Sequence, residues 1–471
     1  MIERSDIFIN GEWVRSSARD TLPVINPVTE ELISTVPRGT AEDADRAVHA
    51  AAAAFPQWSQ TPLEERIHVI ERLAQALNAR SAEITRAIVS ELGYPLEWAS
   101  KAQVLAGIEE LNIIAESLRQ ICWEETIGNA RVCREPSGVV AAITPWNAPL
   151  RTIISKAGAA IAAGCTVALK GSELAPSGSY FFAEMAIQAG VPAGVFNLLS
   201  GTGPEVGEAI ASHPLVDVVS LTGSPRAGRR VMELASRTVK RVHLELGGKS
   251  ANIILDEAQL ERAVKDGVED AFRNAGQACG GLTRMLVPKG RLKDAEEIAV
   301  AKAKSFRLGD PYDPQTTLGP VITSSARDRI RGVIRSGIEE GARMLMGGPE
   351  APQGLPRGYF IQPTIFTTDN KRRIAREEIF GPVVVIIPFD DEADAIEIAN
   401  DSPYGLAAGL WCSNPERARA IAKALRVGRV RINGAPLNKR ATHGGFKLSG
   451  IGREWGRFGV EEFLEYKSIL L

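Results

Sequence analysis

The chain has 471 residues, of which 44% are hydrophobic and 24% are charged, and its formal net charge is −2. This composition is typical of a soluble globular protein, and the length predicts roughly two or three domains. The balanced charge gives no support for a nucleic-acid partner or for a polybasic membrane-binding surface. The five histidines are scattered along the chain, and the sequence predicts no metal site.

The first residues are charged where a signal peptide needs an apolar run, and no stretch resembles the roughly 18 apolar residues of a transmembrane helix. The number of cysteines is odd, and none has CxxC or zinc-finger spacing. We therefore expect a cytoplasmic protein with reduced thiols. The cysteines are Cys122, Cys133, Cys165, Cys279 and Cys412.

The N-terminal part of the chain predicts a hairpin followed by helices. Asn10-Gly11 supplies the positive φ of a tight hairpin turn. Thr40 begins a helix with a capping box, and Thr61 is expected to cap the next helix, with Pro62 at its first position. A further helix is expected over residues 96–118.

From residue 139 onward, short apolar runs alternate with helical segments, and a second series of the same kind begins near residue 251. Apolar runs separated by helices indicate a parallel sheet covered on both faces. We therefore predict an α/β fold with a Rossmann-like cofactor domain and a second α/β domain, divided near Gly247-Gly248. The predicted strands are 139–144, 166–170, 195–199, 218–222 and 242–246, then 251–255, 285–287, 383–387 and 428–433. The predicted helices are 152–163, 176–189, 294–304 and 325–340.

Two glycine-containing βα junctions are candidates for a dinucleotide phosphate site. The first, residues 201–207, has GxGxxxG spacing rather than the Rossmann GxGxxG, so Gly203 and Gly207 fit a structural turn as well as a phosphate loop. In the second, Gly223 permits close backbone approach and Ser224 offers a hydroxyl at a helix start, where free N–H groups attract phosphate. A structural turn remains an alternative here too.

Two further stretches carry reactive side chains. Lys170 and Glu173 follow a predicted strand, at the edge of the sheet where α/β proteins bind ligands, although a solvated loop pair is the alternative. Glu173 would accept from ribose hydroxyls and repel the 2′-phosphate of NADP. Cys279 lies among small residues, which suits either a buried thiol in a glycine-rich turn or a nucleophile that a substrate can approach.

Taken together, the motifs resemble the aldehyde dehydrogenase superfamily, NAD(P)-dependent enzymes that oxidise aldehydes to carboxylic acids. They occur in that family's order and separations, and the resemblance covers essentially the whole chain. The matching motifs are Pro145-Trp146-Asn147, Lys170–Glu173, Gly223–Gly228, Glu245-Leu246-Gly247-Gly248-Lys249, Asn274–Thr283, Glu377–Val383 and Gly445–Gly450.

The resemblance implies a role for three residues in catalysis. Cys279 matches the nucleophile that attacks the aldehyde carbon, and Asn147 matches the amide that, with the Cys279 backbone N–H, holds the oxyanion. Glu245 matches the general base that activates water to hydrolyse the thioester. A neutral amide suits an oxyanion because one such donor is worth about 10²–10³-fold in rate. A carboxylate works as a base near neutral pH when its surroundings raise its pKa.

The resemblance also implies a cofactor, NAD with NADP left open, and a homodimer or homotetramer. On this basis residues 1–119 and 137–246 form the dinucleotide-binding domain and 247–430 the catalytic domain. Residues 120–136 and 457–471 form oligomerisation strands, and 431–456 return to line the active site. The cofactor contacts implied are Thr144, Trp146, Lys170, Glu173, Gly203, Gly207, Gly223, Ser224, Leu246, Glu378 and Phe380.

Some positions depart from the family pattern. Ala148, Ala278 and Gly280 are small where larger residues are frequent, which suggests a roomy mouth and a preference for bulky or aromatic aldehydes over acetaldehyde. Thr442-His443 stands where Pro-Phe is usual. Arg151 lies near the expected entrance, as a substrate contact or as an ordinary surface arginine.

Two departures affect the cofactor rather than the substrate. Gly171 replaces a common proline in the loop that carries Glu173, and Arg226 in the pyrophosphate turn leaves NADP use open.

Two other functions remain as alternatives. One is a CoA-acylating dehydrogenase, which would not need Glu245, and the other is a non-catalytic binding protein on the same fold, which would not need Cys279.

Overall fold

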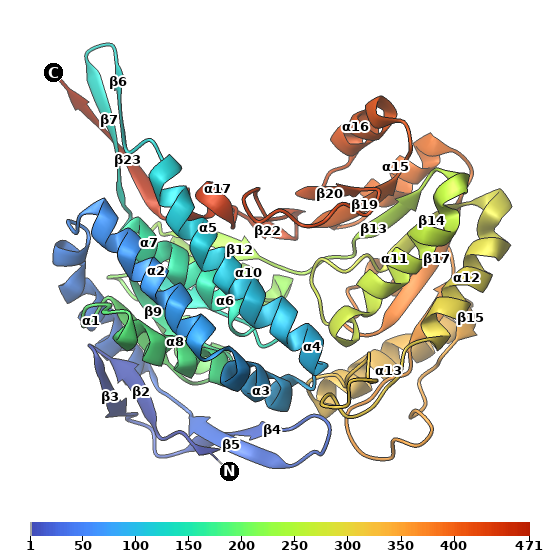
Figure 1. Cartoon of the computed structure of the whole chain (residues 1–471), viewed down its shortest axis with the longest axis horizontal. Coiled ribbons are helices and arrows are strands. Elements are labelled where there is room, and N and C mark those ends of the chain that lie inside the picture. The colour runs from blue at the N-terminus through green and yellow to red at the C-terminus, as the bar shows by residue number, and fades with distance from the viewer. Residues whose placement is uncertain (1) are drawn as a thin grey trace.

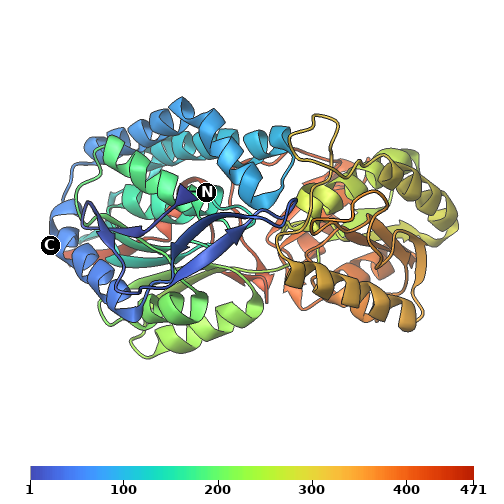
Figure 2. The same cartoon turned by 90° about the horizontal axis from the view of Figure 1, so that it is seen from below.

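The computed structural model describes residues 2–471, with side chains from Arg4 onward. These residues form two lobes, each built on a largely parallel β-sheet with helices packed against it (Figure 1). The first half of the chain forms most of one lobe, and the second lobe is formed by residues from about Ala251 to about Ile432 (Figure 2). The predicted fold class is confirmed. Within the described residues no helix is long and apolar enough to cross a membrane.

The first lobe contains an eight-stranded sheet whose five central strands are parallel. Along the chain the strand order runs outward in one direction from β8 and then restarts on its other side with β11. This reversal creates a crevice beyond the carboxyl ends of β8 and β11, which is where open α/β sheets bind ligands. In spatial order the strands are β22 (Gly450–Ile451), β12 (Arg241–Glu245), β11 (Val218–Thr222), β8 (Val139–Ile143), β9 (Thr166–Lys170), β10 (Phe196–Leu199), β2 (Asp6–Ile9) and β3 (Glu12–Arg15).

Helices cover both faces of this sheet (Figure 2). Alternate residues of β8 point to opposite faces, so Val139, Ala141 and Ile143 join the core under α1, α9 and α10. Val140 and Ala142 join the larger core under α2, α3, α5, α7 and α8. The helical elements are α1 (Ala41–Trp58), α2 (Leu63–Ala79), α3 (Ser81–Leu92), α4 (Leu96–Ala99), η1 (Ser100–Leu105), α5 (Ala106–Gln120), α6 (Arg151–Ile153), η2 (Ile154–Gly158), α7 (Ala159–Ala163), α8 (Ser177–Gln188), η3 (Gly203–Gly207), α9 (Glu208–Ser212) and α10 (Pro225–Ser236).

The second lobe contains a seven-stranded sheet with its own apolar core. Its strands are parallel except for β15, which pairs antiparallel at one edge. In spatial order they are β15 (Arg343–Met346), β16 (Thr364–Thr367), β17 (Val383–Phe389), β14 (Arg284–Pro288), β13 (Ala251–Ile254), β19 (Ala407–Trp411) and β20 (Arg429–Ile432). The helical elements are η4 (Glu257–Gln259), α11 (Leu260–Phe272), η5 (Arg273–Gly276), η6 (Lys289–Arg291), α12 (Leu292–Lys304), α13 (Ser324–Glu339), α14 (Arg373–Arg376), α15 (Glu392–Asn400) and α16 (Pro415–Ala424).

Strands from the two segments expected to form oligomerisation strands, 120–136 and 457–471, pair with each other. Strand β23 (Leu464–Leu470) runs antiparallel along the whole of β7 (Ala130–Pro136), and β6 (Glu124–Ile127) completes a three-stranded sheet. Figure 1 shows this sheet projecting from the first lobe, with the C-terminus near its tip. Helix α17 (Gly456–Glu461) occupies the start of the 457–471 segment, so the predicted strand begins later than expected.

Local signals were confirmed at most N-terminal elements. Asn10 and Gly11 have φ of 53° and 83° in the predicted hairpin turn. The Thr40 side chain accepts from Asp43 N and the Asp43 side chain accepts from Thr40 N, which is the expected capping box. The prediction for Thr61 was wrong: α2 begins at Leu63 with Pro62 as its cap and no side-chain capping bond. The Thr61 hydroxyl donates instead to Gln57 O of the preceding helix.

Small two- and three-stranded sheets complete the chain. One lies near the N-terminus, and the other joins the returning C-terminal segment to the second lobe. The strands are β1 (Ile2–Glu3), β5 (Leu32–Pro37) and β4 (Thr21–Ile25) in the first, and β18 (Tyr404–Gly405) and β21 (Phe446–Lys447) in the second.

Candidate active site

A cavity of about 410 Å³ lies beyond the carboxyl ends of β8 and β11, and both lobes contribute to its walls. All three predicted catalytic residues line it, although they are far apart in the sequence. Six of the predicted cofactor residues line it as well, whereas five others do not. Those that line it are Asn147, Glu245, Cys279, Trp146, Gly223, Ser224, Leu246, Glu378 and Phe380. Those outside its lining are Thr144, Lys170, Glu173, Gly203 and Gly207.

Cys279 lies on a loop with an unusual backbone. Just after α11 ends, Asn274, Ala275 and Gly276 have φ of 52°, 53° and 74°, three consecutive residues in the left-handed region. A Cβ on Gly276 would lie 1.9 Å from the Gly381 carbonyl oxygen, so only glycine allows this close approach between the two segments. Such backbone strain persists where surrounding structure fixes it, and it concentrates at functional sites.

The Asn147 side chain is tied to the cysteine loop. Its Nδ2 donates to Gln277 O at 3.0 Å, and Asn274 Nδ2 lies 3.4 Å from Asn147 O. Gln277 is in turn held by its own side chain, which accepts from Ile322 N at 2.9 Å. An amide nitrogen carries two N–H donors, so one Asn147 donor holds the loop and the second is available to an oxyanion.

The Cys279 side chain is partly exposed, whereas the protein around it disfavours the thiolate. Burial raises the pKa of the Cys279 thiol to about 11, and the nearby carboxylates of Glu245 and Glu378 raise it further. Arg429 and Arg151 act in the opposite direction. The resting residue is therefore a thiol, and its proton must leave before the sulfur attacks a carbonyl carbon.

Glu245 is the last residue of β12, and its carboxylate is buried at the cavity wall with neither oxygen hydrogen-bonded within the described part of the chain. Burial, followed by the negative charge of Glu454, raises the pKa of the Glu245 carboxyl well above its usual range. Lys156, Arg453 and Arg429 lower it only in part. A carboxyl group with a raised pKa and unoccupied oxygens is suited to general base catalysis.

The crevice between β8 and β11 has the features of a cofactor site. Thr144 directly follows β8 and Thr222 ends β11, and both have buried hydroxyls with no hydrogen-bond partner within residues 2–471. Ser224 caps α10, so the first N–H groups of that helix face the crevice. Trp146 and Phe380 meet edge to face, with centroids 5.5 Å apart. These residues fit a dinucleotide, because its phosphates and hydroxyls would be hydrogen-bond partners for the unpaired threonine hydroxyls and the helix N–H groups.

Comparison with known proteins decides the family. The family model described as "Aldehyde dehydrogenase family" matches residues 13–469. The chain belongs to the aldehyde dehydrogenase family. It is thus an NAD(P)-dependent enzyme that oxidises an aldehyde to the carboxylic acid. The non-catalytic alternative is excluded.

Three relatives resemble this aldehyde dehydrogenase over nearly its full length. The 3-succinoylsemialdehyde-pyridine dehydrogenase of a Pseudomonas species is 48% identical over 100% of this chain and 99% of its own. A cysteine-to-alanine mutant of aldehyde dehydrogenase C from Pseudomonas syringae, solved with NAD+ and octanal, is 44% identical, covers 99% and 96%, and has a TM-score of 0.98. Mycobacterium tuberculosis aldehyde dehydrogenase with NAD+ is 40% identical, covers 100% and 98%, and has a TM-score of 0.97.

Apart from Thr144, the predicted cofactor residues outside the cavity lining fall into two pairs. In this aldehyde dehydrogenase Lys170 ends β9, beside β8, and its Nζ lies 2.7 Å from Glu173 Oε2. This pair is one strand away from the crevice, where it can meet the distal part of a dinucleotide. Gly203 and Gly207 belong to the turn η3 after β10, one strand farther away. Their position favours the structural-turn alternative.

Sequence reasoning missed several charged residues of the site. Lys156 Nζ is buried and lies 2.7 Å from Glu454 Oε1 and 3.1 Å from Ser220 Oγ. A signal for Lys156 existed, because it is the lone cation within an otherwise apolar helical stretch. Glu454 and Trp455 gave no local signal, since the returning C-terminal segment brings them to the cavity through the pairing of β22 with β12.

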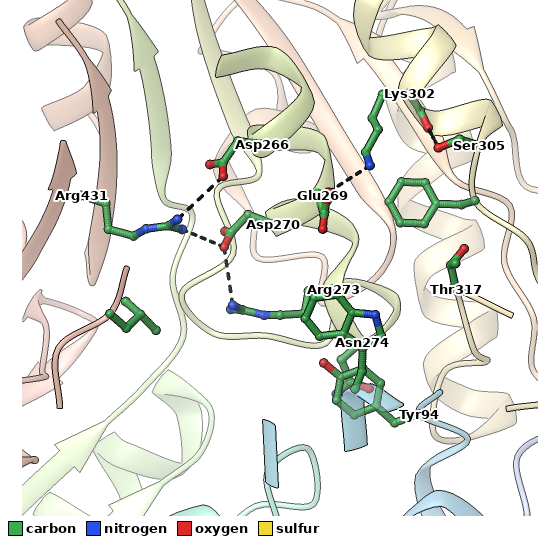
Figure 3. Close-up of a pocket in the computed structure, with 13 residues that line it drawn as sticks. Tyr94, Asp266, Glu269, Asp270, Arg273, Asn274, Lys302, Ser305, Thr317 and Arg431 are labelled. Carbon is green, nitrogen blue, oxygen red and sulfur yellow. Dashed lines mark hydrogen bonds and ion pairs between the residues drawn. The ribbon is translucent and has the colours of Figure 1, made fainter. Parts of the chain in front are cut away.

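A second cavity of about 300 Å³ lies on the other side of the Arg273-Asn274 segment. Figure 3 shows its charged side chains facing one another. Arg431 pairs with Asp270 at 3.1 Å, Arg273 with the same Asp270 at 3.6 Å, and Lys302 with Glu269 at 2.9 Å. Each charged side chain of the second cavity therefore has an oppositely charged partner among the described residues.

Three potential metal ligands also approach each other, although the sequence predicted no metal site. His49 and His213 each lie near Asp45, at 3.3 Å and 3.2 Å. The cluster lies mostly at the surface, far from the lining of the active-site cavity, and exposed groups of this kind are common without a metal.

Proposed function

We propose that Cys279 is the nucleophile, that Asn147 stabilises the oxyanion and that Glu245 is the general base. The observation that carries this proposal is that one cavity gathers these three side chains from β12 and two distant loops. Water, rather than CoA, is the acyl acceptor, because the buried Glu245 carboxylate is suited to activating it. A CoA-acylating enzyme would have no use for such a base.

In the first half of the reaction, the Cys279 thiol gives up its proton to solvent water, and the thiolate attacks the aldehyde carbon and forms a thiohemiacetal. The free Asn147 N–H and the Cys279 backbone N–H stabilise the oxyanion. When bound, NAD(P) supplies the acceptor for the hydride that leaves this carbon. In the second half, Glu245 takes a proton from water, the resulting hydroxide attacks the Cys279 thioester, and the sulfur departs as thiolate with release of the acid.

We propose that the adenosine end of the dinucleotide meets Lys170 and Glu173, the pyrophosphate meets Gly223 and Ser224, and Glu378 meets the nicotinamide ribose. Burial raises the pKa of Glu378 to about 7, although it accepts from Gly248 N at 3.1 Å, so a further donor would help to hold it ionised. Trp146, Leu246 and Phe380 complete the nicotinamide end. Thr144 lies between the two ends, and Gly203 and Gly207 shape the outer turn.

We expect NAD to be preferred over NADP because the Glu173 carboxylate repels a 2′-phosphate. Glu173→Gln should therefore improve kcat/KM for NADP relative to NAD by about tenfold, the effect of roughly 1.4 kcal/mol. Steady-state kinetics with both cofactors measure the ratio. Glu233→Gln, an exposed carboxylate on α10, is the matched control and should leave the ratio unchanged. An unchanged ratio in the Glu173 variant would remove this residue from cofactor selection.

The substrate side of the cavity is expected to accept bulky or aromatic aldehydes. Ala148 lines it with a small side chain, and a Cβ on Gly280 would lie only 3.2 Å from Arg429 Nη2. Arg151 lines the same wall, with a buried Nε that has no partner within residues 2–471, and we assign it to a polar acceptor on the substrate. A relative named for a pyridine semialdehyde and another solved with octanal support this substrate class.

An aldehyde panel tests this assignment. We expect kcat/KM for octanal or an aryl aldehyde to exceed that for acetaldehyde by at least about tenfold, since each buried CH₂ contributes about 0.8 kcal/mol. Ala148→Phe should reduce this advantage by narrowing the cavity. Arg151→Met should lower kcat/KM most for aldehydes that carry a carbonyl or carboxylate acceptor. A preference for acetaldehyde in the unaltered enzyme would contradict the roomy mouth.

We propose that the β6–β7–β23 sheet joins subunits of a homodimer or homotetramer. The residues 120–136 and 457–471 would then be the oligomerisation module beside the cofactor domain, 1–119 with 137–246, and the catalytic domain, 247–430, while 431–456 return to the active site. Support comes from the apolar side chains exposed on this sheet, with Ile127 at 60%, Tyr466 at 62% and Leu470 at 74% exposure. Exposed apolar strands of this kind commonly pair with another chain.

Light scattering after size-exclusion chromatography tests the oligomer. The double variant Ile469→Glu/Leu470→Glu should move the enzyme toward the monomer, because it places charge on the exposed end of β23. Val239→Glu changes a residue that is 90% exposed on the first lobe and should leave the mass unchanged. A monomeric unaltered enzyme would refute the proposal.

We also propose a cytoplasmic location, since all five cysteines are free and the nucleophile must stay reduced.

A further inference from the structure

His443 connects the proposed base to a buried arginine. His443 Nε2 lies 3.3 Å from Glu245 Oε2, and on the opposite side of the ring His443 Nδ1 lies 3.1 Å from Arg429 Nη1. Among the Lys, Arg and His side chains of residues 2–471, only His443 comes within ion-pairing distance of a Glu245 oxygen. The three side chains therefore form a short chain that ends at the base.

The contact with Arg429 defines which ring nitrogen carries the proton. A guanidinium donates hydrogen bonds and cannot accept them, so Nδ1 must be the unprotonated nitrogen. Burial and the surrounding cations Arg429, Arg151, Lys156 and Arg453 lower the pKa of His443 well below its ordinary value, so the ring is neutral. The single ring proton is then on Nε2, the nitrogen that faces Glu245.

The ring has little freedom to turn away from the base. It stacks on Trp455 with centroids 4.4 Å apart and planes 20° apart. The backbone of His443 exchanges hydrogen bonds of 2.8 Å and 2.7 Å with Glu454, and the side chain is almost fully buried. A ring held at its face, its backbone and its Nδ1 presents Nε2–H in one direction.

We propose that His443 is a positioning residue for Glu245, held in the required tautomer by Arg429. Its Nε2–H directs one carboxylate oxygen and leaves the other facing the cavity, where it takes the proton from the attacking water. The His443 Nε2–Glu245 Oε2 contact has the distance of a hydrogen bond but not its alignment, and catalytic hydrogen bonds commonly become aligned only in the complex with substrate. His443 itself gains and loses no proton. This inference rests on the proposed role of Glu245.

The same observations disfavour two simpler roles. If the ring only filled space against Trp455, an aromatic residue without nitrogen atoms would serve equally well, although it would remove the acceptor that His443 Nδ1 offers to Arg429 Nη1. If the ring only contacted substrate, its protonated nitrogen would have no reason to face Glu245. The variant His443→Phe tests this directly, because phenylalanine is the usual residue at this position in the aldehyde dehydrogenase family.

His443→Phe keeps the stack and removes both nitrogens, whereas His443→Gln keeps an N–H donor near the position of Nε2. Quenched-flow mass spectrometry measures formation and decay of the acyl group on Cys279 separately. We expect His443→Phe to slow the decay about tenfold or more and to leave acylation within about twofold. His443→Gln should recover most of the decay rate. His68→Phe, on the exposed face of α2, is the control.

Equal slowing of acylation and decay, or unchanged decay, in His443→Phe would overturn the positioning role. A lowered melting temperature with both rates unchanged would also overturn it, because the ring would then be structural only. The Glu245→Gln variant distinguishes failure of the His443 proposal from failure of the assignment of Glu245 as the base. If Glu245→Gln blocks decay and His443→Phe does not, only this inference fails. If Glu245→Gln leaves decay intact, the assignment of the base fails and this inference fails with it.

Discussion

We expect Cys279→Ala to fold normally and to form no measurable NADH, with kcat reduced by at least about 10⁴-fold. The loss is large because the sulfur forms the covalent intermediate in both halves of the reaction, and no neighbouring side chain replaces it. Spectrophotometric NADH formation with a bulky aldehyde measures the effect. Cys122→Ala, which removes an exposed cysteine far from the cavity, is the matched control and should retain full activity.

Two further measurements, the melting temperature and the affinity for NAD, show whether the lost activity reflects lost catalysis rather than misfolding or lost cofactor binding. The Cys279 variant should keep its melting temperature, because alanine fits a loop whose shape is set by Asn274, Ala275 and Gly276 rather than by the thiol. It should also bind NAD with unchanged affinity, since the crevice between β8 and β11 is intact. Activity that survives in this variant would contradict covalent catalysis by Cys279.

We expect Glu245→Gln to produce one equivalent of NADH per active site and then to stall, with steady-state turnover lowered by about 10²–10⁴-fold. Glutamine keeps the size of the side chain but cannot take a proton from water, so the thioester forms and persists. Stopped-flow absorbance of NADH measures the burst and the steady rate in one trace. Addition of CoA should not restore turnover to the unaltered enzyme's level, whereas a CoA-acylating enzyme would form acyl-CoA.

The same residue sets the pH dependence of thioester hydrolysis. Burial and Glu454 raise the pKa of Glu245, and the base works only as the carboxylate. Hydrolysis should therefore be fastest above that raised pKa and should slow as pH falls through it. In Glu245→Gln the residual hydrolysis should lose this dependence. A full steady-state rate in the variant, or the same pH profile as the unaltered enzyme, would exclude Glu245 as the base.

Short-range patterns predicted much of the fold. The capping box at Thr40 and the Asn10-Gly11 turn depend on neighbours within a few residues, so they could be inferred from the sequence. The apolar strands of the parallel sheets were found for the same reason, since burial on both faces makes them continuous runs. The prediction that Thr61 caps α2 was wrong because capping needs a particular backbone geometry. The Thr61 hydroxyl instead bonds to the end of α1.

Long-range pairings could not be predicted in this way. Strand β16 is rich in β-branched residues but has only four residues, and β19 contains mainly small residues, so neither forms a long β-branched run that would identify a strand. No local feature of 120–136 and 464–470 indicates that these segments pair with each other. The fold class was nevertheless correct, because it depends on the number and order of the strong strands.

The active site divides in the same way. Cys279, Asn147 and Glu245 were located through motifs, and the structure adds that they share one cavity. The resemblance implied that residues 431–456 line the active site, but no local feature singled out Glu454, Trp455 or the Arg429–His443 contact within or beside that segment. The resemblance marked His443 only as a departure, and its partners became visible in three dimensions.

Mass spectrometry of the Glu245→Gln variant after incubation with aldehyde and NAD tests the covalent mechanism most directly. We predict a mass increase equal to one acyl group, located on the peptide that contains Cys279, together with one equivalent of NADH. The adduct should be absent without NAD and should disappear with hydroxylamine, as a thioester does. Repeated turnover without an adduct, or an acyl group on any residue other than Cys279, would contradict the mechanism.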